Sequence, residues 1–61
     1  GDFIRFNEDV ESVSVYDLLG KESKVSLVNN EVSISELATG TYLMKVVTVE
    51  GKSFTKTIIK K

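Results

Sequence analysis

Apolar and polar residues alternate along most of this chain, which is the pattern of half-buried β-strands. Val13 and Val15 share one face of such a run, and Ser12 and Ser14 take the other. This alternation begins one residue out of phase with Val10, which precedes it. No window carries the 3.6-residue period of an amphipathic helix. The pattern predicts six short strands, over residues 2–6, 10–17, 22–28, 31–37, 41–49 and 53–60.

Turn-forming residues separate these runs. Gly20, the pair Asn29 and Asn30, and Gly51 tolerate the left-handed backbone that tight reversals need. The stretch "SELATG" breaks the alternation and is expected to form a loop or a helical turn closed by Gly40. Turn signals every eight to twelve residues are typical of sandwiches and barrels. We therefore predict an all-β fold, a small immunoglobulin-like antiparallel β-sandwich of about six to seven short strands.

The longest run covers residues 41–49. Large apolar side chains occupy both of its faces, Tyr42, Met44 and Val46 on one and Leu43, Val47 and Val49 on the other. A strand that is apolar on both faces usually crosses the middle of a packed sheet. Tyr42 follows Gly40 closely and is expected to bond back to the backbone, as in a tyrosine corner. Gly40 and Tyr42 are therefore interpreted as architectural residues.

Length and composition limit the chain to one small domain. It has 61 residues and neither Cys nor His, so disulfides and the usual zinc ligands are absent from its sequence. A paired β core must carry the stability, helped by a neighbouring domain or a second copy. Six strands are one fewer than immunoglobulin domains commonly have, which suggests a piece of a longer protein with an unpaired edge strand. Such an edge predicts self-association.

The charged residues point to no catalytic site. Eight basic and nine acidic residues leave no basic stripe, so nucleic acid is not predicted as a partner. Without His or Cys, neither a Ser-His-Asp nor a Cys-His arrangement can form. Glu8, Asp9 and Glu11 lie together, and a solvated acidic loop is favoured there over a carboxylate pair or a weak calcium site. The sequence predicts no enzyme, no metal site and no cofactor.

Lys60 and Lys61 at the end of the last run allow two interpretations. They can keep the end of an edge strand soluble and discourage pairing with other chains, or they can be read by a partner. The residue pattern alone favours the first interpretation.

The order of the motifs "VSVYDLLGKE" and "ISELATGTYLMKVVTVEGKSFTKTIIKK" strongly resembles the type A carboxy-terminal sorting domain of the type IX secretion system. That family belongs to Gram-negative bacteria of the Bacteroidetes group. The residues that carry the resemblance are Val13, Val15, Tyr16, Asp17, Gly20 and Lys21, then Leu37, Gly40, Tyr42, Lys45 and Val46, then Gly51, Lys56, Ile58, Ile59, Lys60 and Lys61. One departure is the lack of any proline, because family members usually begin with a Pro-Asn-Pro-like segment.

The resemblance implies a non-catalytic signal that spans residues 1–61 and belongs to a larger secreted protein. An upstream cargo would pass from the periplasm through the outer-membrane translocon to the cell surface or the medium. A sortase-like cysteine protease would typically remove the domain. The alternative is an accessory immunoglobulin-like module that binds carbohydrate or protein.

The resemblance also assigns roles to individual residues and reverses the preference for the terminal lysines. Recognition by the secretion machinery is expected at Lys56, Ile58, Ile59, Lys60 and Lys61. Architectural roles are expected at Gly20, Lys21, Gly40, Tyr42 and Gly51.

Overall fold

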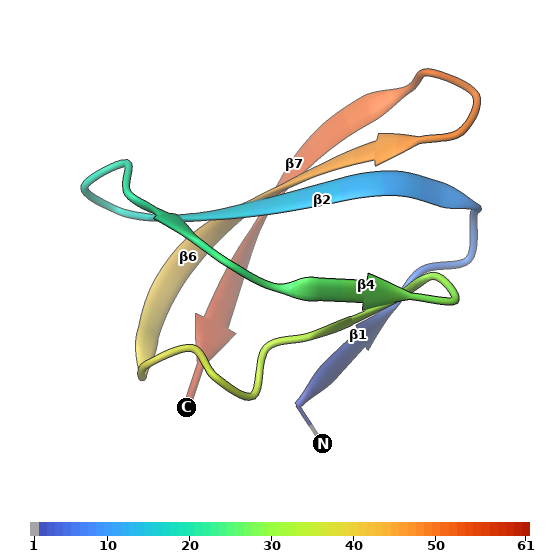
Figure 1. Cartoon of the computed structure of the whole chain (residues 1–61). Helices are drawn as coiled ribbons and strands as arrows, with labels where there is room; N and C mark the ends of the chain where they lie inside the picture. The colour runs from blue at the N-terminus through green and yellow to red at the C-terminus, as the bar shows by residue number, and fades with distance from the viewer. Residues whose placement is uncertain (1) are drawn as a thin grey trace.

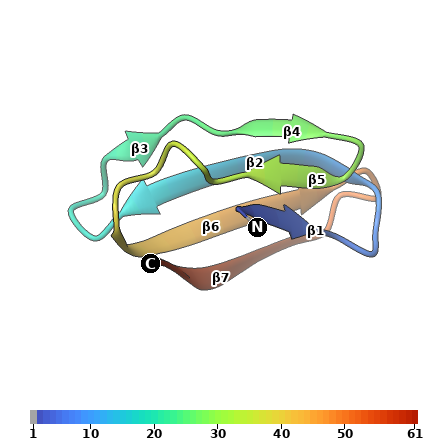
Figure 2. The same cartoon turned by 90° about the horizontal axis from the view of Figure 1, so that it is seen from below.

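Two antiparallel sheets face each other in the computed structural model, which describes residues 2–61 (Figures 1 and 2). The strands are β1 (Phe3–Arg5), β2 (Val10–Asp17), β3 (Glu22–Ser23), β4 (Ser26–Val28), β5 (Glu31–Ser33), β6 (Gly40–Thr48) and β7 (Ser53–Lys60). One sheet has the order β3-β2-β6-β7 and the other the order β1-β5-β4. The smallest extent of the Cα trace is 15 Å, which fits two layers about 10 Å apart. The all-β prediction is confirmed.

Residues 22–28 form two strands where the pattern predicts one. β3 pairs with β2 in the four-stranded sheet, whereas β4 pairs with β5 in the three-stranded sheet. The chain crosses between the layers at Lys24 and Val25, and the half-buried Val25 packs against the core. The expected six strands become seven through this split, so the strand count gives no reason to infer a missing strand.

A β-bulge explains the change of phase in the second run. The pairing of β2 with β6 shifts between Val10 and Ser12, so that Val10 lies opposite the buried Thr48 while Val13 lies opposite the buried Val46. The extra residue at the bulge keeps both valines on the inner face although they are three positions apart.

The turn between β4 and β5 is built from Asn29 and Asn30. Their φ angles are 53° and 61°, the left-handed values that a two-residue hairpin turn requires. The side chain of Asn30 also accepts a hydrogen bond from the Val10 amide and donates one to the Asp9 carboxylate, both at 2.9 Å. The turn is thereby fastened to the start of β2 in the other sheet.

The core lies between the sheets. Its buried apolar members are Val15, Val32, Leu37, Tyr42, Met44, Val46 and Ile58. β6 lies between β2 and β7, which confirms its central position. One of its two apolar faces is left uncovered, since Leu43 is 40% exposed, and Val49 just beyond the strand is 57% exposed. A two-layer fold covers only one face of each sheet, so the second apolar face of β6 meets solvent.

Candidate recognition surface on the last strand

β7 is the outer strand of the four-stranded sheet. It pairs with β6 from Ser53 to Lys60, and no other strand within residues 2–61 pairs with its second edge. The hairpin that leads into it turns at Gly51, whose φ of 91° suits glycine. Thr48 closes this turn, since its hydroxyl accepts a hydrogen bond from the Lys52 amide at 3.2 Å. The candidate recognition residues therefore begin on a well-anchored strand with one free edge.

Alternation along β7 places two lysines on its inner face. Residues directly opposite in an antiparallel pair point to the same side of the sheet. Lys56 lies opposite the buried Met44, and Ile58 lies opposite the buried Tyr42. Lys60 follows in the same phase, two residues beyond Ile58. A charge that points inward on an edge strand is a known device against unwanted strand pairing.

Lys60 is engaged within the fold. Its ammonium donates hydrogen bonds to the carbonyl oxygens of Ile34 at 3.1 Å and Ser35 at 3.3 Å. It also lies 3.8 Å from the Asp2 carboxylate, and its side chain is only 13% exposed. These contacts connect the end of β7 to the opposite layer and close that end of the sandwich. We call these three contacts the Lys60 clasp.

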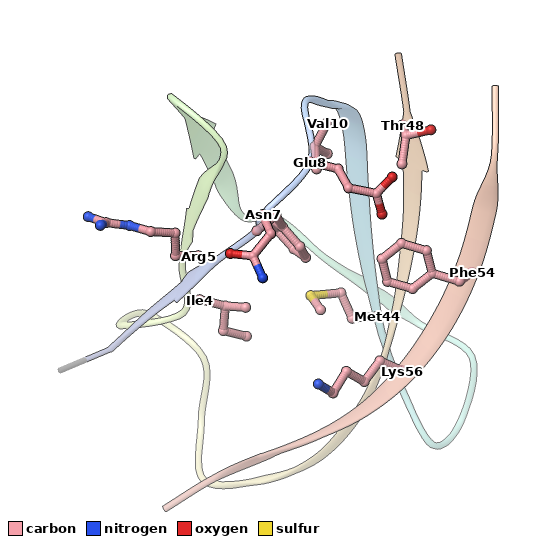
Figure 3. A pocket seen from close by; sticks show the side chains of 10 residues that line it. Ile4, Arg5, Asn7, Glu8, Val10, Met44, Thr48, Phe54 and Lys56 are labelled. Atoms are coloured by element: carbon pink, nitrogen blue, oxygen red, sulfur yellow. The ribbon is translucent and has the colours of Figure 1, made fainter. Parts of the chain in front are cut away.

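Lys56 has a different environment. It forms no ion pair with any acidic side chain in the described part of the chain. It lines a pocket of about 240 Å³ where the sandwich is open between β1 and β7. Figure 3 shows Ile4 and Asn7 on the β1 side of this pocket, and Phe54 and Lys56 on the β7 side, around Met44.

The remaining candidate recognition residues divide between core and surface. Ile58 is 9% exposed and belongs to the core, while Ile59 is 65% exposed on the outer face. Lys61 is exposed beyond the end of β7. A partner thus has direct access to Lys56, Ile59 and Lys61, whereas Ile58 and Lys60 hold the strand in place. Recognition at these five positions stays a prediction.

The turn between β2 and β3 contains two residues with expected architectural roles. The Asp17 carboxylate accepts hydrogen bonds from the amides of Leu19 and Lys21, both at 2.9 Å. Gly20 has a φ of 87° at the tip of this turn. The side chain of Leu19 is consequently held out in solvent at 95% exposure.

Tyr42 bonds back to the backbone, as expected from its position after Gly40. Its hydroxyl donates a hydrogen bond to the Ala38 carbonyl at 2.7 Å. Gly40 itself is the first residue of β6, and the loop over residues 35–39 precedes it. The bond ties this loop to the base of the long strand.

The acidic residues near the start of β2 are exposed. Asp9 accepts the hydrogen bond from Asn30, Glu11 lies nearby on the surface, and Glu8 is exposed where it lines the pocket that Lys56 also lines. Across residues 2–61, no group of three or more His, Cys, Asp or Glu is arranged to hold a metal ion. The same residues include no helix long and apolar enough to cross a membrane.

The pocket beside Lys56 is the feature that sequence reasoning missed. Phe54, Lys56, Ile58 and Lys60 alternate in one phase, and this spacing alone places two lysines on the side of the strand that carries core residues. That signal was available in the sequence. The approach of β1 to this side of the molecule was not.

Charge is distributed unevenly around β7. Residues 51–61 contain four lysines and no acidic residue, whereas residues 1–50 contain four basic and nine acidic residues. The last strand is therefore a basic edge on an otherwise acidic domain.

Fold and surface together define a small two-sheet β domain with one long, basic strand edge that no other strand within residues 2–61 pairs with. The chain matches the secretion system C-terminal sorting domain over residues 3–61 and belongs to that family, the sorting domains of type IX secretion. Membership indicates a sorting signal, export across the outer membrane to the cell surface or the medium, and contact with the secretion machinery and a cargo. Neither a curated protein nor a solved structure matches the chain.

Proposed function

We propose that this domain acts as a non-catalytic address that the outer-membrane translocon binds and a sortase-like cysteine protease then separates from the cargo. The family match over residues 3–61 is the observation that carries this proposal. The sequence lacks His and Cys, so the common nucleophilic triads cannot be assembled from it. The chemistry then belongs to the partners, and the domain is their ligand and substrate.

The recognition surface in this proposal is β7 with Lys61. Lys56, Ile59 and Lys61 are accessible and supply the direct contacts, while Ile58 and Lys60 keep the strand in its presented position. Lysines at such a surface steer an acidic receptor and fix register more than they add affinity. The cargo lies upstream, crosses the periplasm and arrives at the cell surface or in the medium.

A secretion assay tests the proposal. The chain is fused behind a fluorescent protein with an export signal and expressed in a bacterium that has a type IX system. The test variant combines Lys56→Glu, Ile59→Ser and Lys61→Glu, all at exposed positions. The control combines Lys24→Glu and Val28→Ser, which are exposed away from β7.

We expect the unmodified fusion and the control to reach the surface or the medium, and the test variant to accumulate in the periplasm. Mass spectrometry of the exported cargo is expected to show loss of the domain. Surface display of the test variant at the control level would exclude β7 as the recognition surface. Retention of the unmodified fusion in the periplasm would refute the sorting function itself.

A further inference from the structure

We propose that the free edge of β7 and the pocket beside Lys56 form one docking site for an extended segment of a partner protein. The segment adds to the sheet next to β7, points alternate apolar side chains into the pocket and places a carboxylate beside Lys56. The proposal rests on the proposed function only in taking the partner to be a component of the secretion machinery.

Strand length selects β7 as the docking edge. β7 has eight residues, whereas the other outer strands β1, β3 and β4 have three, two and three. Main-chain hydrogen bonds supply the affinity when a segment adds to a sheet, so a longer edge binds more strongly. β7 offers the most hydrogen-bonding positions of the four.

The pocket supplies the contacts for alternate side chains of the added segment. A strand added to β7 lies about 4.8 Å from it and points every second side chain toward the other layer. Those side chains enter the gap between β7 and β1, where Ile4, Met44 and Phe54 line the pocket. Phe54 is 41% exposed there, so an apolar residue of the segment would cover it.

Lys56 determines the charge of the partner. Its ammonium lines the same pocket and has no ion pair within residues 2–61, because Glu8, the acidic residue of the pocket, lies on the other side of Met44 (Figure 3). A carboxylate on the neighbouring strand would form a favourable cross-strand pair with it. Pairing of two β7 edges from two copies would instead bring lysines together, since residues 51–61 carry no acidic residue. The charges therefore favour an acidic partner segment over a second copy.

A tethered probe tests this site. A segment of alternating Thr and Val, with one inward position set to Glu opposite Lys56, is attached after Lys61 through a Gly-Ser linker of about six residues. A matched probe has Lys at that position. Tethering raises the effective concentration, so a weak strand–edge interaction is measurable by urea denaturation and by the amide NMR shifts of residues 53–60.

The Glu probe is expected to lower the unfolding equilibrium constant roughly five-fold more than the Lys probe, from the usual size of cross-strand charge pairs. Lys56→Glu is expected to reverse this preference, whereas Lys24→Glu, at an exposed site away from β7, is expected to leave it unchanged. Amide shifts confined to β7 and the pocket residues would complete the support.

Three outcomes would overturn the docking site: equal effects of the two probes, a preference that Lys56→Glu does not alter, or β7 shifts that appear with protein concentration alone. The last outcome would identify a second copy as the occupant.

The secretion assay separates this proposal from the sorting function. If the fluorescent fusion is exported normally but the Glu and Lys probes have equal effects, the docking site is refuted and the sorting function stands. If the Glu probe is preferred, Lys56→Glu reverses that preference and export fails, the sorting function is refuted and the docking site stands.

Discussion

Lys56 and Lys60 lie four positions apart on the same face of the same strand, yet their surroundings differ. Lys60 reaches two carbonyl oxygens and lies near Asp2 in the other layer, with 13% of its side chain exposed. Lys56 is exposed at the mouth of a pocket. The two environments differ because different parts of the opposite layer face β7 at the two positions. The segment after β5 closes one end, and a gap beside β1 leaves the other open. The same residue type therefore has a structural role at Lys60, where β7 ends, and is accessible to a partner at Lys56, in the middle of the strand.

The largest expected effect comes from Ile58, which lies between the two lysines on the inner face. Ile58→Ala removes buried methyl groups from the core and is expected to lower the free energy of unfolding by about 2–4 kcal/mol. Urea denaturation measures this loss. The adjacent exposed Ile59→Ala is the control and is expected to change stability by about 0.5 kcal/mol or less. Equal losses at the two positions would contradict the assigned faces of β7.

Removal of the Lys60 clasp is the next largest change. Lys60→Met keeps the length of the side chain but removes the charged donor to the carbonyls of Ile34 and Ser35, which is expected to cost about 1–3 kcal/mol, although the Ile34 carbonyl keeps its hydrogen bond from the Leu37 amide at 3.1 Å. Lys61→Met is the matched control at an exposed position. If thermal denaturation shows the same stability for both variants, Lys60 does not hold the closed end.

Tyr42 supports that closed end from the neighbouring strand. Tyr42→Phe removes the hydroxyl that bonds the Ala38 carbonyl, with an expected loss of about 0.5–1.5 kcal/mol in the free energy of unfolding. Tyr16→Phe on β2 is a suitable comparison, because no side-chain hydrogen bond of Tyr16 occurs within the described residues. A loss at Tyr16 as large as that at Tyr42 would argue against a specific role for this bond.

The smallest effect on stability is expected at the open end. Lys56→Met is expected to change the free energy of unfolding by about 0.5 kcal/mol or less, since the ammonium forms no ion pair with the residues that the structure describes. It is expected to increase self-association, because it removes the inward-pointing charge from an edge strand. Sedimentation velocity over a range of concentrations measures this. Lys45→Met on the central strand β6 is the control. Equal self-association of both variants would show that Lys56 does not prevent pairing at the edge of β7.

Local pattern was sufficient to predict the turns and the strands apart from the split of residues 22–28, and the alternation of residues 54–60 also contains the inward phase of Lys56 and Lys60. Alternation and turn chemistry act over a few residues and are visible in the sequence. The Lys60 clasp joins residues 26 positions apart, so no local signal could show which carbonyls the ammonium reaches. The split of residues 22–28 was hidden for a related reason. Ser23, Val25 and Leu27 keep one phase through the crossing, and only the identity of the pairing strand changes.

That crossing has a consequence for how the domain opens. One continuous segment holds β3 against β2 in one layer and β4 against β5 in the other, so separation of the layers pulls on the hydrogen bonds of both. Backbone amides of β5 and β6 are therefore expected to exchange with deuterium in a single concerted event, with no stage at which one sheet survives alone.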